Sequence, residues 1–172
     1  MGHMMEHHLQ QVGMGQLKVG ARDEQLQAVL GSCVGIAFIW KKGGRCGLAH
    51  CLLPESPDAD NSLGARYVSQ AVPSLLRLMG ARQSDYPDIE VVLAGGASMF
   101  SGRSGRLQVG QQNVAAARKY LSQCGLHVEY CELGGRCGRQ ILIDCADQSY
   151  SITKIVAQSP EPAYGNERSA AY

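Results

Sequence analysis

The sequence has no excess of charge of either sign. Its 16 Lys and Arg residues stand against 15 Asp and Glu, a formal net charge of +1 with histidine neutral. Nucleic acid and anionic membrane surfaces attract strongly basic proteins, so this balance argues against either partner. No apolar run is long enough to cross a bilayer as a helix. We therefore expect no nucleic-acid partner and no direct insertion into a membrane.

A secretion signal is also missing, because no apolar segment follows the first residues. This predicts a cytoplasmic location. Residues 2–4 read Gly-His-Met and resemble a cloning remnant, so we expect residues 1–11 to be disordered. The tail 157–172 is rich in Pro, Ser and Ala, and we expect it to be disordered too. The stretch 12–156 has a suitable length for a single domain.

The seven cysteines lack the paired C-x2-C spacing by which zinc sites are recognised. Their odd number and the missing secretion signal predict free thiols in a reducing compartment. A metal site is the alternative, but the spacings disfavour it, and we expect neither a metal nor a cofactor. Buried cysteine commonly behaves as a small apolar residue. We prefer that interpretation for six of the seven, which are Cys46, Cys51, Cys124, Cys131, Cys137 and Cys145.

Residues 95–105 form a long glycine-rich loop between a strand-like run and a helical segment, which is the position of a phosphate cradle. The loop has neither the Gly-Lys-Ser/Thr ending of a P-loop nor the G-x-G-x-x-G spacing of a dinucleotide site. Nucleotide binding is therefore disfavoured. A rim that presents backbone groups to a peptide substrate fits these residues better.

The spacing of apolar residues predicts both strands and helices. Strands are expected at 12–20, 26–40, 46–53, 89–94, 127–133, 140–144 and 149–156, and helices at 63–79 and 110–123. Gly80 and Gly125 should end the helices, and Pro73 should kink the first helix or mark its true start. Residues 54–63 should form an ordered loop or lid. This order of elements predicts a layered α/β or α+β sandwich.

Two stretches have the residue types needed for covalent chemistry. The turn at 30–36 presents Cys33 between two apolar runs, and the strand-like run 47–54 holds His50 among apolar residues. A turn at Gly43-Gly44 would fold the chain back and bring His50 beside Cys33. A thiol with an imidazole in reach is a nucleophile with its base, and the imidazole lowers the pKa of the thiol.

Each of these residues taken alone has a plainer interpretation. His50 fits a core histidine with satisfied hydrogen bonds, and Cys33 fits a small buried residue. Their combination changes this, because Gly31 and Ser32 permit a tight turn that exposes the sulfur and whose N–H groups line an oxyanion site. The residues together predict acyl transfer or hydrolysis of an amide.

Five motifs occur in an order that resembles the chemoreceptor glutamine deamidase family, the CheD proteins of bacterial chemotaxis. They are LGSCV at 30–34, GLAHCLLP at 47–54, AGGASMF at 94–100, VGQQNV at 109–114 and GGR at 134–136. The resemblance covers about residues 12–156, nearly the whole chain. It is carried by the combination of motifs, because each one is too short to be specific.

This resemblance implies a three-layer α/β sandwich of mixed and antiparallel sheet with two main helices, similar to the deamidase domain of cytotoxic necrotizing toxins. It implies hydrolysis of selected glutamine side chains to glutamate on the cytoplasmic domain of chemoreceptors, with release of ammonia. Some members of the family also bind a CheC-type phosphatase of the response regulator, which is a second expected partner.

Residue by residue, the resemblance implies Cys33 as the nucleophile and His50 as the catalytic base and acid. The third family residue, a threonine six positions before the cysteine, falls on Gln27. In an extended strand Gln27 would point to the same side as the thiol, and its carbonyl would accept a hydrogen bond from His50. The alternative is a surface glutamine, with a backbone carbonyl that orients His50 instead.

Four further residues are candidates for binding the substrate or the oxyanion: Ser32, Gly95, Gly96 and Ser98. Asn113 also matches a family motif, without an assignable role. A different class of function is a binding module, a CheD-like scaffold that regulates a phosphatase or a receptor with little turnover. Cys33 and His50 weigh against the scaffold, whereas Gln27 favours it. Redox sensing by thiols is a third hypothesis and rests only on the number of cysteines.

Overall fold

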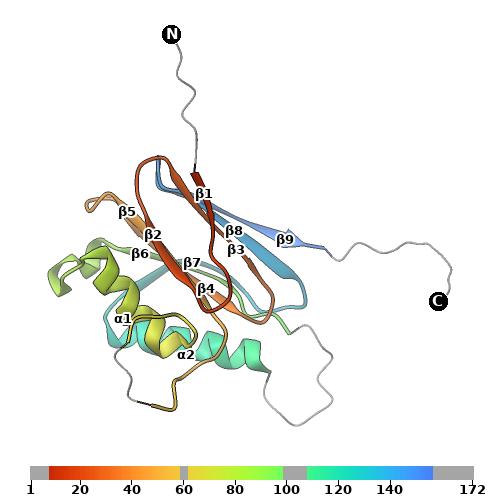
Figure 1. Ribbon diagram of the computed structural model, residues 1–172. Coiled ribbons are helices and arrows are strands. Elements are labelled where there is room, and N and C mark those ends of the chain that lie inside the picture. Colours follow the sequence, from red (N-terminus) through yellow and green to blue (C-terminus); the bar gives the residue numbers. More distant parts are fainter. Residues whose placement is uncertain (1–7, 59–61, 99–107, 157–172) are drawn as a thin grey trace, which may run out of the picture.

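The computed structural model describes residues 8–58, 62–98 and 108–156. Within these ranges the chain forms two sheets and two α-helices (Figure 1). The strands are β1 (His8–Gln11), β2 (Leu17–Gly20), β3 (Glu24–Leu30), β4 (Val34–Trp40), β5 (Arg45–Cys51), β6 (Glu90–Gly95), β7 (His127–Leu133), β8 (Gly138–Asp144) and β9 (Ser149–Ile155). The helices are α1 (Val68–Met79), the short 3-10 helix η1 (Gln83–Asp88) and α2 (Val109–Gln123).

The strands pair into a four-stranded sheet in the order β1-β3-β8-β9 and a five-stranded sheet in the order β2-β5-β4-β6-β7. Most neighbours are antiparallel, but β1 runs parallel to β3 and β6 runs parallel to β7, so both sheets are mixed. Figure 1 shows the four-stranded sheet on one side of the five-stranded sheet and both α-helices on the other. The architecture is therefore three layers, within the predicted α/β class.

The residue pattern of β4 explains why the five-stranded sheet lies in the middle. This strand is apolar at nearly every position, as expected for a strand covered on both faces. Val34, Ile36 and Phe38 pack toward the helices, and Ala37 and Ile39 face the other sheet. By contrast, β3 alternates buried and more exposed residues, because one face of the four-stranded sheet is open to solvent.

Helix α1 has the predicted apolar face but begins later than predicted. The residues buried along it are Val68, Ala71, Val72, Ser74, Leu75, Leu76 and Met79. Gly80 ends the helix with a φ of 71°, as predicted for a glycine in this position. The helix starts at Val68 and continues through Pro73, so the proline does not mark its start. The first N–H groups bond instead to the carbonyls of Leu53 and Pro54, a tertiary contact that no local pattern reveals.

Two predicted strands are divided in the structure. The stretch 12–20 is a turn followed by β2, and residues 8–11, which we expected to be disordered, form β1 beside β3. The stretch 26–40 is interrupted at 31–33, where the sequence predicted a turn that carries Cys33. The two halves join different sheets, and periodicity does not reveal this change because both halves are apolar. The tail 157–172 and residues 1–7 lie outside the described residues.

The other elements agree with the sequence. The hairpin of β4 and β5 is present with Gly43-Gly44 in its turn, and α2 was predicted within one residue at its start. Of the predicted loop 54–63, residues 59–61 lie outside the described residues, as do residues 99–107 of the glycine-rich loop.

Helix α2 begins in close contact with the backbone that follows β6. A Cβ on Gly110 would lie 2.5 Å from the carbonyl oxygen of Gly96 and 2.6 Å from that of Ala97. We predict that Gly110→Ala lowers the free energy of unfolding by about 2 kcal/mol in urea denaturation, although alanine normally favours a helix. The control is Gln111→Ala at the next, exposed position, which should change that free energy by less than about 0.5 kcal/mol. Equal effects of the two substitutions would contradict the close contact.

Candidate active site

Cys33 lies where the chain passes from one sheet to the other. β3 ends at Leu30 in the four-stranded sheet, and β4 begins at Val34 in the five-stranded sheet. The three residues between them, Gly31 to Cys33, form the crossing, which we call the Cys33 turn. The Cys33 side chain packs among the residues between the two sheets and is 9% exposed.

Each carbonyl of the Cys33 turn accepts a hydrogen bond from a different donor. The first and last carbonyls accept from the N–H groups of Ala97 and Gly96, at 2.9 and 2.8 Å. The middle carbonyl, that of Ser32, accepts from the side-chain amide of Asn113 at 3.1 Å. The turn is therefore held along its whole length by the backbone after β6 and by helix α2.

Gly95 and Gly96 permit the close contact between the Cys33 turn and the backbone after β6. Gly95 has a φ of 99°, a conformation that L side chains rarely adopt, and a Cβ there would lie 2.3 Å from the Cys33 carbonyl oxygen. Gly96 also has a positive φ, of 65°. Both positions are glycine because the positive φ, and at Gly95 also the contact with the Cys33 carbonyl, disfavour a residue with a Cβ.

Three of the four residues predicted to bind the substrate or oxyanion lie at or beside the Cys33 turn. Ser32 belongs to the turn, and Gly95 and Gly96 pack against it. The N–H of Gly96 is engaged by the Cys33 carbonyl, and the N–H of Ser98 donates to the Gly135 carbonyl at 2.8 Å. Neither of these N–H groups is therefore available to an oxyanion in this arrangement. Contacts of the four residues with a substrate stay a prediction.

His50 enters the same interior from the neighbouring strand. In the antiparallel pair of β4 and β5, Gly35 lies opposite His50 and Val34 lies opposite Cys51. Continued by one residue, this register makes Cys33 a diagonal neighbour of His50. Alternation along β5 directs the imidazole between the two sheets, where Cys33 also packs. The structure thus brings together the two residues that the sequence paired.

The imidazole of His50 is held by a backbone carbonyl. Its Nδ1 lies 2.9 Å from the carbonyl oxygen of Val12, in the segment between β1 and β2. Because a carbonyl oxygen only accepts, Nδ1 carries the proton and Nε2 carries the lone pair. The same segment also bonds the main chain of His50, through Gly15 and Gln16. This tautomer leaves Nε2 able to act as a base.

Burial keeps both groups neutral in the resting protein. It raises the pKa of the Cys33 thiol above its ordinary value of 9.0, against a smaller lowering by the residue's own backbone N–H. It lowers the pKa of the His50 imidazole below its ordinary value of 6.5, against a smaller raising by the bond to Val12. The sequence predicted a lowered thiol pKa, and the direction differs because desolvation by burial is the largest influence on the thiol.

Gln27 faces away from this pair. It alternates along β3 with two fully buried residues, so its side chain lies on the outer face with Val29, which is 54% exposed. The prediction that Gln27 points to the side of the thiol is wrong, because the chain changes sheets at the Cys33 turn. Its side-chain oxygen accepts a hydrogen bond from the amide of Gln11 on β1.

Gln27 is nevertheless linked to His50 through the main chain. The Gln27 carbonyl accepts from the N–H of Val12 at 2.7 Å, and the Val12 carbonyl in turn holds the imidazole. Of the two alternatives for orienting His50, these bonds fit the backbone carbonyl. A catalytic role of the Gln27 side chain stays a prediction.

The position of Val12 leads to a spectroscopic prediction. Long-range ¹⁵N–¹H correlation spectra at pH 7.5 should show His50 as the neutral tautomer with its proton on Nδ1. Gln27→Leu should leave these ring signals unchanged, since Gln27 reaches Val12 through its backbone. A proton on Nε2, or a tautomer that changes in Gln27→Leu, would contradict the bond to Val12.

The other six cysteines do not cluster around Cys33 as a metal site. Three of them are buried, as expected for small apolar residues, and these are Cys46, Cys51 and Cys145. Cys46 and Cys145 hydrogen-bond to each other between the sheets, which raises the pKa of Cys46 and lowers that of Cys145. In the ranges that the structure describes, no group of three or more His, Cys, Asp or Glu side chains is placed to hold a metal ion.

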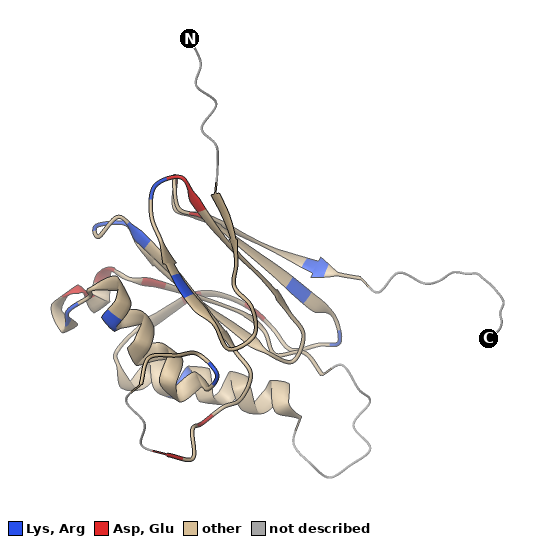
Figure 2. Cartoon of the chain, in the orientation of Figure 1, with Lys and Arg blue, Asp and Glu red and all other residues tan. Residues whose placement is uncertain are grey.

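Charged residues of both signs are spread over strands, loops and helices (Figure 2).

Arg139 at the start of β8 is buried, and its Nη1 donates to the carbonyls of Gly134 and Cys137. The N–H of Gly134 donates to the carbonyl of Gly95. Arg139 therefore supports the loop at 134–137, which is bonded to Gly95.

Across the described ranges, no helix is long and apolar enough to cross a membrane.

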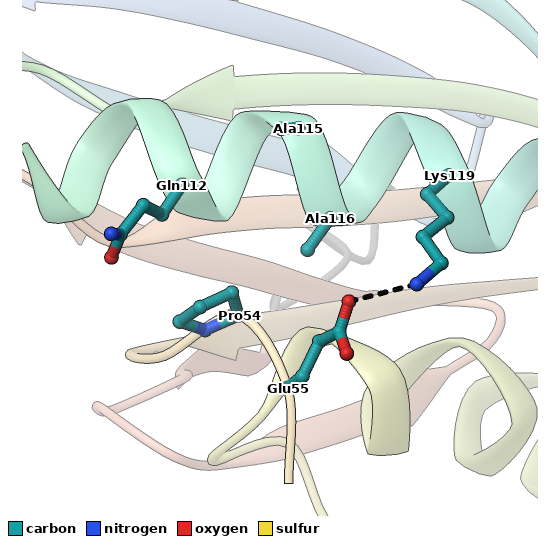
Figure 3. Close-up of a pocket in the computed structure, with 6 residues that line it drawn as sticks. All are labelled: Pro54, Glu55, Gln112, Ala115, Ala116 and Lys119. Atoms are coloured by element: carbon teal, nitrogen blue, oxygen red, sulfur yellow. Dashed lines mark hydrogen bonds and ion pairs between the residues drawn. The ribbon is translucent and has the colours of Figure 1, made fainter. Parts of the chain in front are cut away.

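A shallow pocket lies on the helix side of the five-stranded sheet (Figure 3). Its volume is about 380 Å³, and its lining residues are Pro54, Glu55, Gln112, Ala115, Ala116 and Lys119. The Lys119 ammonium and the Glu55 carboxylate form an ion pair at 3.0 Å. Because Cys33 and His50 do not line it, this pocket is separate from the candidate active site.

Sequence reasoning missed one site residue and left another without a role. Val12 orients the imidazole through its carbonyl, which every residue type possesses, so no sequence signal marks it. Asn113 stood in a recognised motif, and a polar residue on the apolar face of a predicted helix was a signal that its amide has buried partners.

Comparisons with known proteins identify relatives of this chain. A family model described as CheD chemotactic sensory transduction matches residues 52–154. A protein of Bdellovibrio bacteriovorus named chemoreceptor glutamine deamidase CheD is 39% identical over 153 residues, which is 88% of this chain and 96% of that one. A Methanococcus maripaludis protein of the same name is 37% identical over 83% of this chain and 93% of that one.

The matched family segment begins after His50, so it bears on neither Cys33 nor His50. Among solved structures, Neisseria meningitidis protein NMB0706 aligns with a TM-score of 0.42 and 13% identity, over 69% of this chain and 51% of that chain. A likeness this distant carries no weight for the fold. The similarity to cytotoxic necrotizing toxins stays a prediction.

Proposed function

Because this chain belongs to the CheD family, and the relatives above carry the name chemoreceptor glutamine deamidase, we propose that it hydrolyses glutamine side chains of chemoreceptors to glutamate. Cys33 is the nucleophile, and His50 is the general base and acid. One observation carries the proposal: His50 and Cys33 share the interior between the sheets, with Nδ1 of the imidazole bonded to Val12 and Nε2 left as the base.

The first half of the reaction forms a thioester. Nε2 of His50 takes the proton of the Cys33 thiol while the sulfur attacks the carboxamide carbon, and the carbonyl oxygen becomes an oxyanion. Backbone N–H groups at the Cys33 turn stabilise this charge. The protonated imidazole then gives its proton to the departing nitrogen, and ammonia leaves as the carbonyl re-forms.

The second half consumes water and restores the enzyme. Nε2 of His50 takes a proton from water, and the resulting hydroxide attacks the γ-glutamyl thioester. The sulfur leaves, recovers the proton from the imidazole, and the product is a glutamate side chain. Water must react faster than a protein amine, because attack by an amine would give transglutamination instead.

The resting charge state fits this sequence of steps. The thiol is neutral and the imidazole is neutral, so a base with an available lone pair shares the interior with a nucleophile that must lose its proton. The sulfur is nearly buried, so the substrate must bring its reacting group to it on a long, slender side chain. The glutamine carboxamide, at the end of an unbranched side chain, meets this requirement.

Partners and location follow as parts of the same proposal. The substrate is the cytoplasmic domain of a chemoreceptor, which places the reaction in the cytoplasm. A CheC-type phosphatase is a proposed second partner. The competing hypothesis is a scaffold that binds receptor or phosphatase with little turnover, and the first test below separates the two.

The proposed nucleophile is tested with a purified receptor cytoplasmic fragment. Peptide mass spectrometry should show conversion of receptor glutamine by the wild-type chain and a loss of at least about 1000-fold in Cys33→Ala. His50→Ala should behave similarly while binding of the fragment is retained. Cys131→Ala, at an exposed cysteine, is the matched control and should keep full activity. Turnover in Cys33→Ala would exclude the thioester, and tight receptor binding without conversion by the wild type would favour the scaffold.

The charge state of the pair gives a separate pH prediction. Since the pKa of Cys33 is raised above 9.0, the thiolate fraction at neutral pH is below that of an ordinary thiol. The rate of Cys33 alkylation by iodoacetamide should therefore rise about tenfold per pH unit from pH 6.5 to 8.5. Peptide mass spectrometry measures this rate for Cys33 and for exposed Cys131 in one sample. A rate that is level across this range would indicate a thiolate–imidazolium pair and contradict the neutral resting state.

A further inference from the structure

Asn113 is a buried polar residue that touches both halves of the candidate active site. It lies on the sheet-facing side of α2 and is fully buried. Its amide Nδ2 donates to the carbonyl of Ser32 at 3.1 Å and to that of Leu52 at 2.9 Å. Ser32 directly precedes Cys33, and Leu52 follows His50 by two residues. One side chain therefore joins the turn that carries the thiol to the residue directly after the strand that carries the imidazole.

The bond to Ser32 sets the direction of the next N–H group. The Ser32 carbonyl and the Cys33 N–H belong to one peptide unit, and the peptide bonds of the described residues are trans. In a trans peptide the C=O and the N–H point in opposite directions. Asn113 holds the carbonyl toward the helix layer, so the Cys33 N–H points away from that layer.

The thiol and the imidazole lie on the side to which this N–H points. Cys33 packs between the two sheets, and alternation along β5 directs His50 there as well. The Cys33 N–H also lies near its own sulfur, where it acts to lower the pKa of the thiol, and this agrees with the direction. A donor beside the attacking sulfur is where the oxygen of a tetrahedral intermediate acquires its charge.

One polar atom of Asn113 is left without a partner by the fold. Its Oδ1 is buried and has no hydrogen-bond partner among the described residues. A buried acceptor without a donor is destabilising. The Leu121 side chain further along the same face shows that α2 accommodates apolar residues against this sheet.

We propose that Asn113 is a positioning residue that holds the Ser32–Cys33 peptide so that the Cys33 N–H stabilises the oxyanion. The role rests on the proposed covalent mechanism. Asn113 acts through the peptide that it orients and does not touch the substrate. Its second bond, to Leu52, keeps the end of β5 in register with the turn.

The test compares two reactions of the same sulfur. With p-nitrophenyl acetate, the Cys33 thiolate adds to the ester carbonyl, an oxyanion forms, and p-nitrophenolate leaves as the acetyl thioester is made. With iodoacetamide, the thiolate displaces iodide from carbon and no oxyanion forms. Only the first reaction needs the oriented N–H, and neither needs a receptor.

In Asn113→Ala the rate of acetylation of Cys33 should fall by about tenfold to a hundredfold, less than the loss of a whole oxyanion donor. Alkylation of Cys33 should change by less than about threefold, since it requires no such donor. Both rates are read by peptide mass spectrometry at a temperature where each variant is folded. With the receptor fragment, kcat should fall by a similar factor while KM changes little.

Two other substitutions test the role of Asn113 if the Asn113→Ala variant is unstable. Asn113→Leu fills the space without a donor and should show the same split between the two rates. Asn113→Ser retains one donor and should recover part of the acetylation rate. The control is Ser74→Ala. It removes a buried hydroxyl of helix α1 that accepts a hydrogen bond from the N–H of Gly64. This substitution should leave the ratio of the acetylation and alkylation rates unchanged.

The outcomes separate this proposal from the function on which it rests. Equal losses in acetylation and alkylation, or no loss in acetylation, would overturn the role of Asn113 and reduce it to a packing contact. A wild-type chain that never converts receptor glutamine, yet shows the split in Asn113→Ala, would defeat the proposed substrate while the positioning role stands.

Discussion

The hydrogen bonds to the Cys33 turn are the constraint on which the candidate active site depends. Three residues carry the chain between two sheets, and such a short crossing has no ladder of its own to fix it. All three carbonyls are held from outside, one of them by Asn113 at a separation of 81 residues. Gly95, Gly96 and Gly110 let backbone approach backbone closely enough for this. The glycines are thus required by the turn as much as by their own loops.

The three layers contribute different parts of the site. The five-stranded sheet sets Cys33 and His50 as diagonal neighbours, and the helix layer supplies Asn113. The imidazole is held from the other side by Val12, whose N–H is bonded to β3 of the four-stranded sheet. Packing between these layers also excludes water, and this desolvation keeps thiol and imidazole neutral. The packing that forms the fold therefore also sets the protonation states of Cys33 and His50.

Local patterns predicted the elements whose stability is local. Helix α2 and the hairpin of β4 and β5 were anticipated because periodicity and turn glycines lie within a few residues of one another. The start of α1 was not, because it is set by the carbonyls of Leu53 and Pro54. The division of 26–40 between two sheets was missed for a related reason: both halves are apolar, and burial in either sheet satisfies them equally.

The sequence by itself determined the α/β class, the pairing of Cys33 with His50 and the family to which the motifs belong. These depend on residue types and on short spacings, which the linear chain displays directly. Only the tertiary structure decided that Val12, and not the side chain of Gln27, meets the imidazole, and that Asn113 reaches Ser32. Both depend on backbone carbonyls. Every residue has one, so the sequence carries no mark of which carbonyl will be used until the sheets and helices have packed.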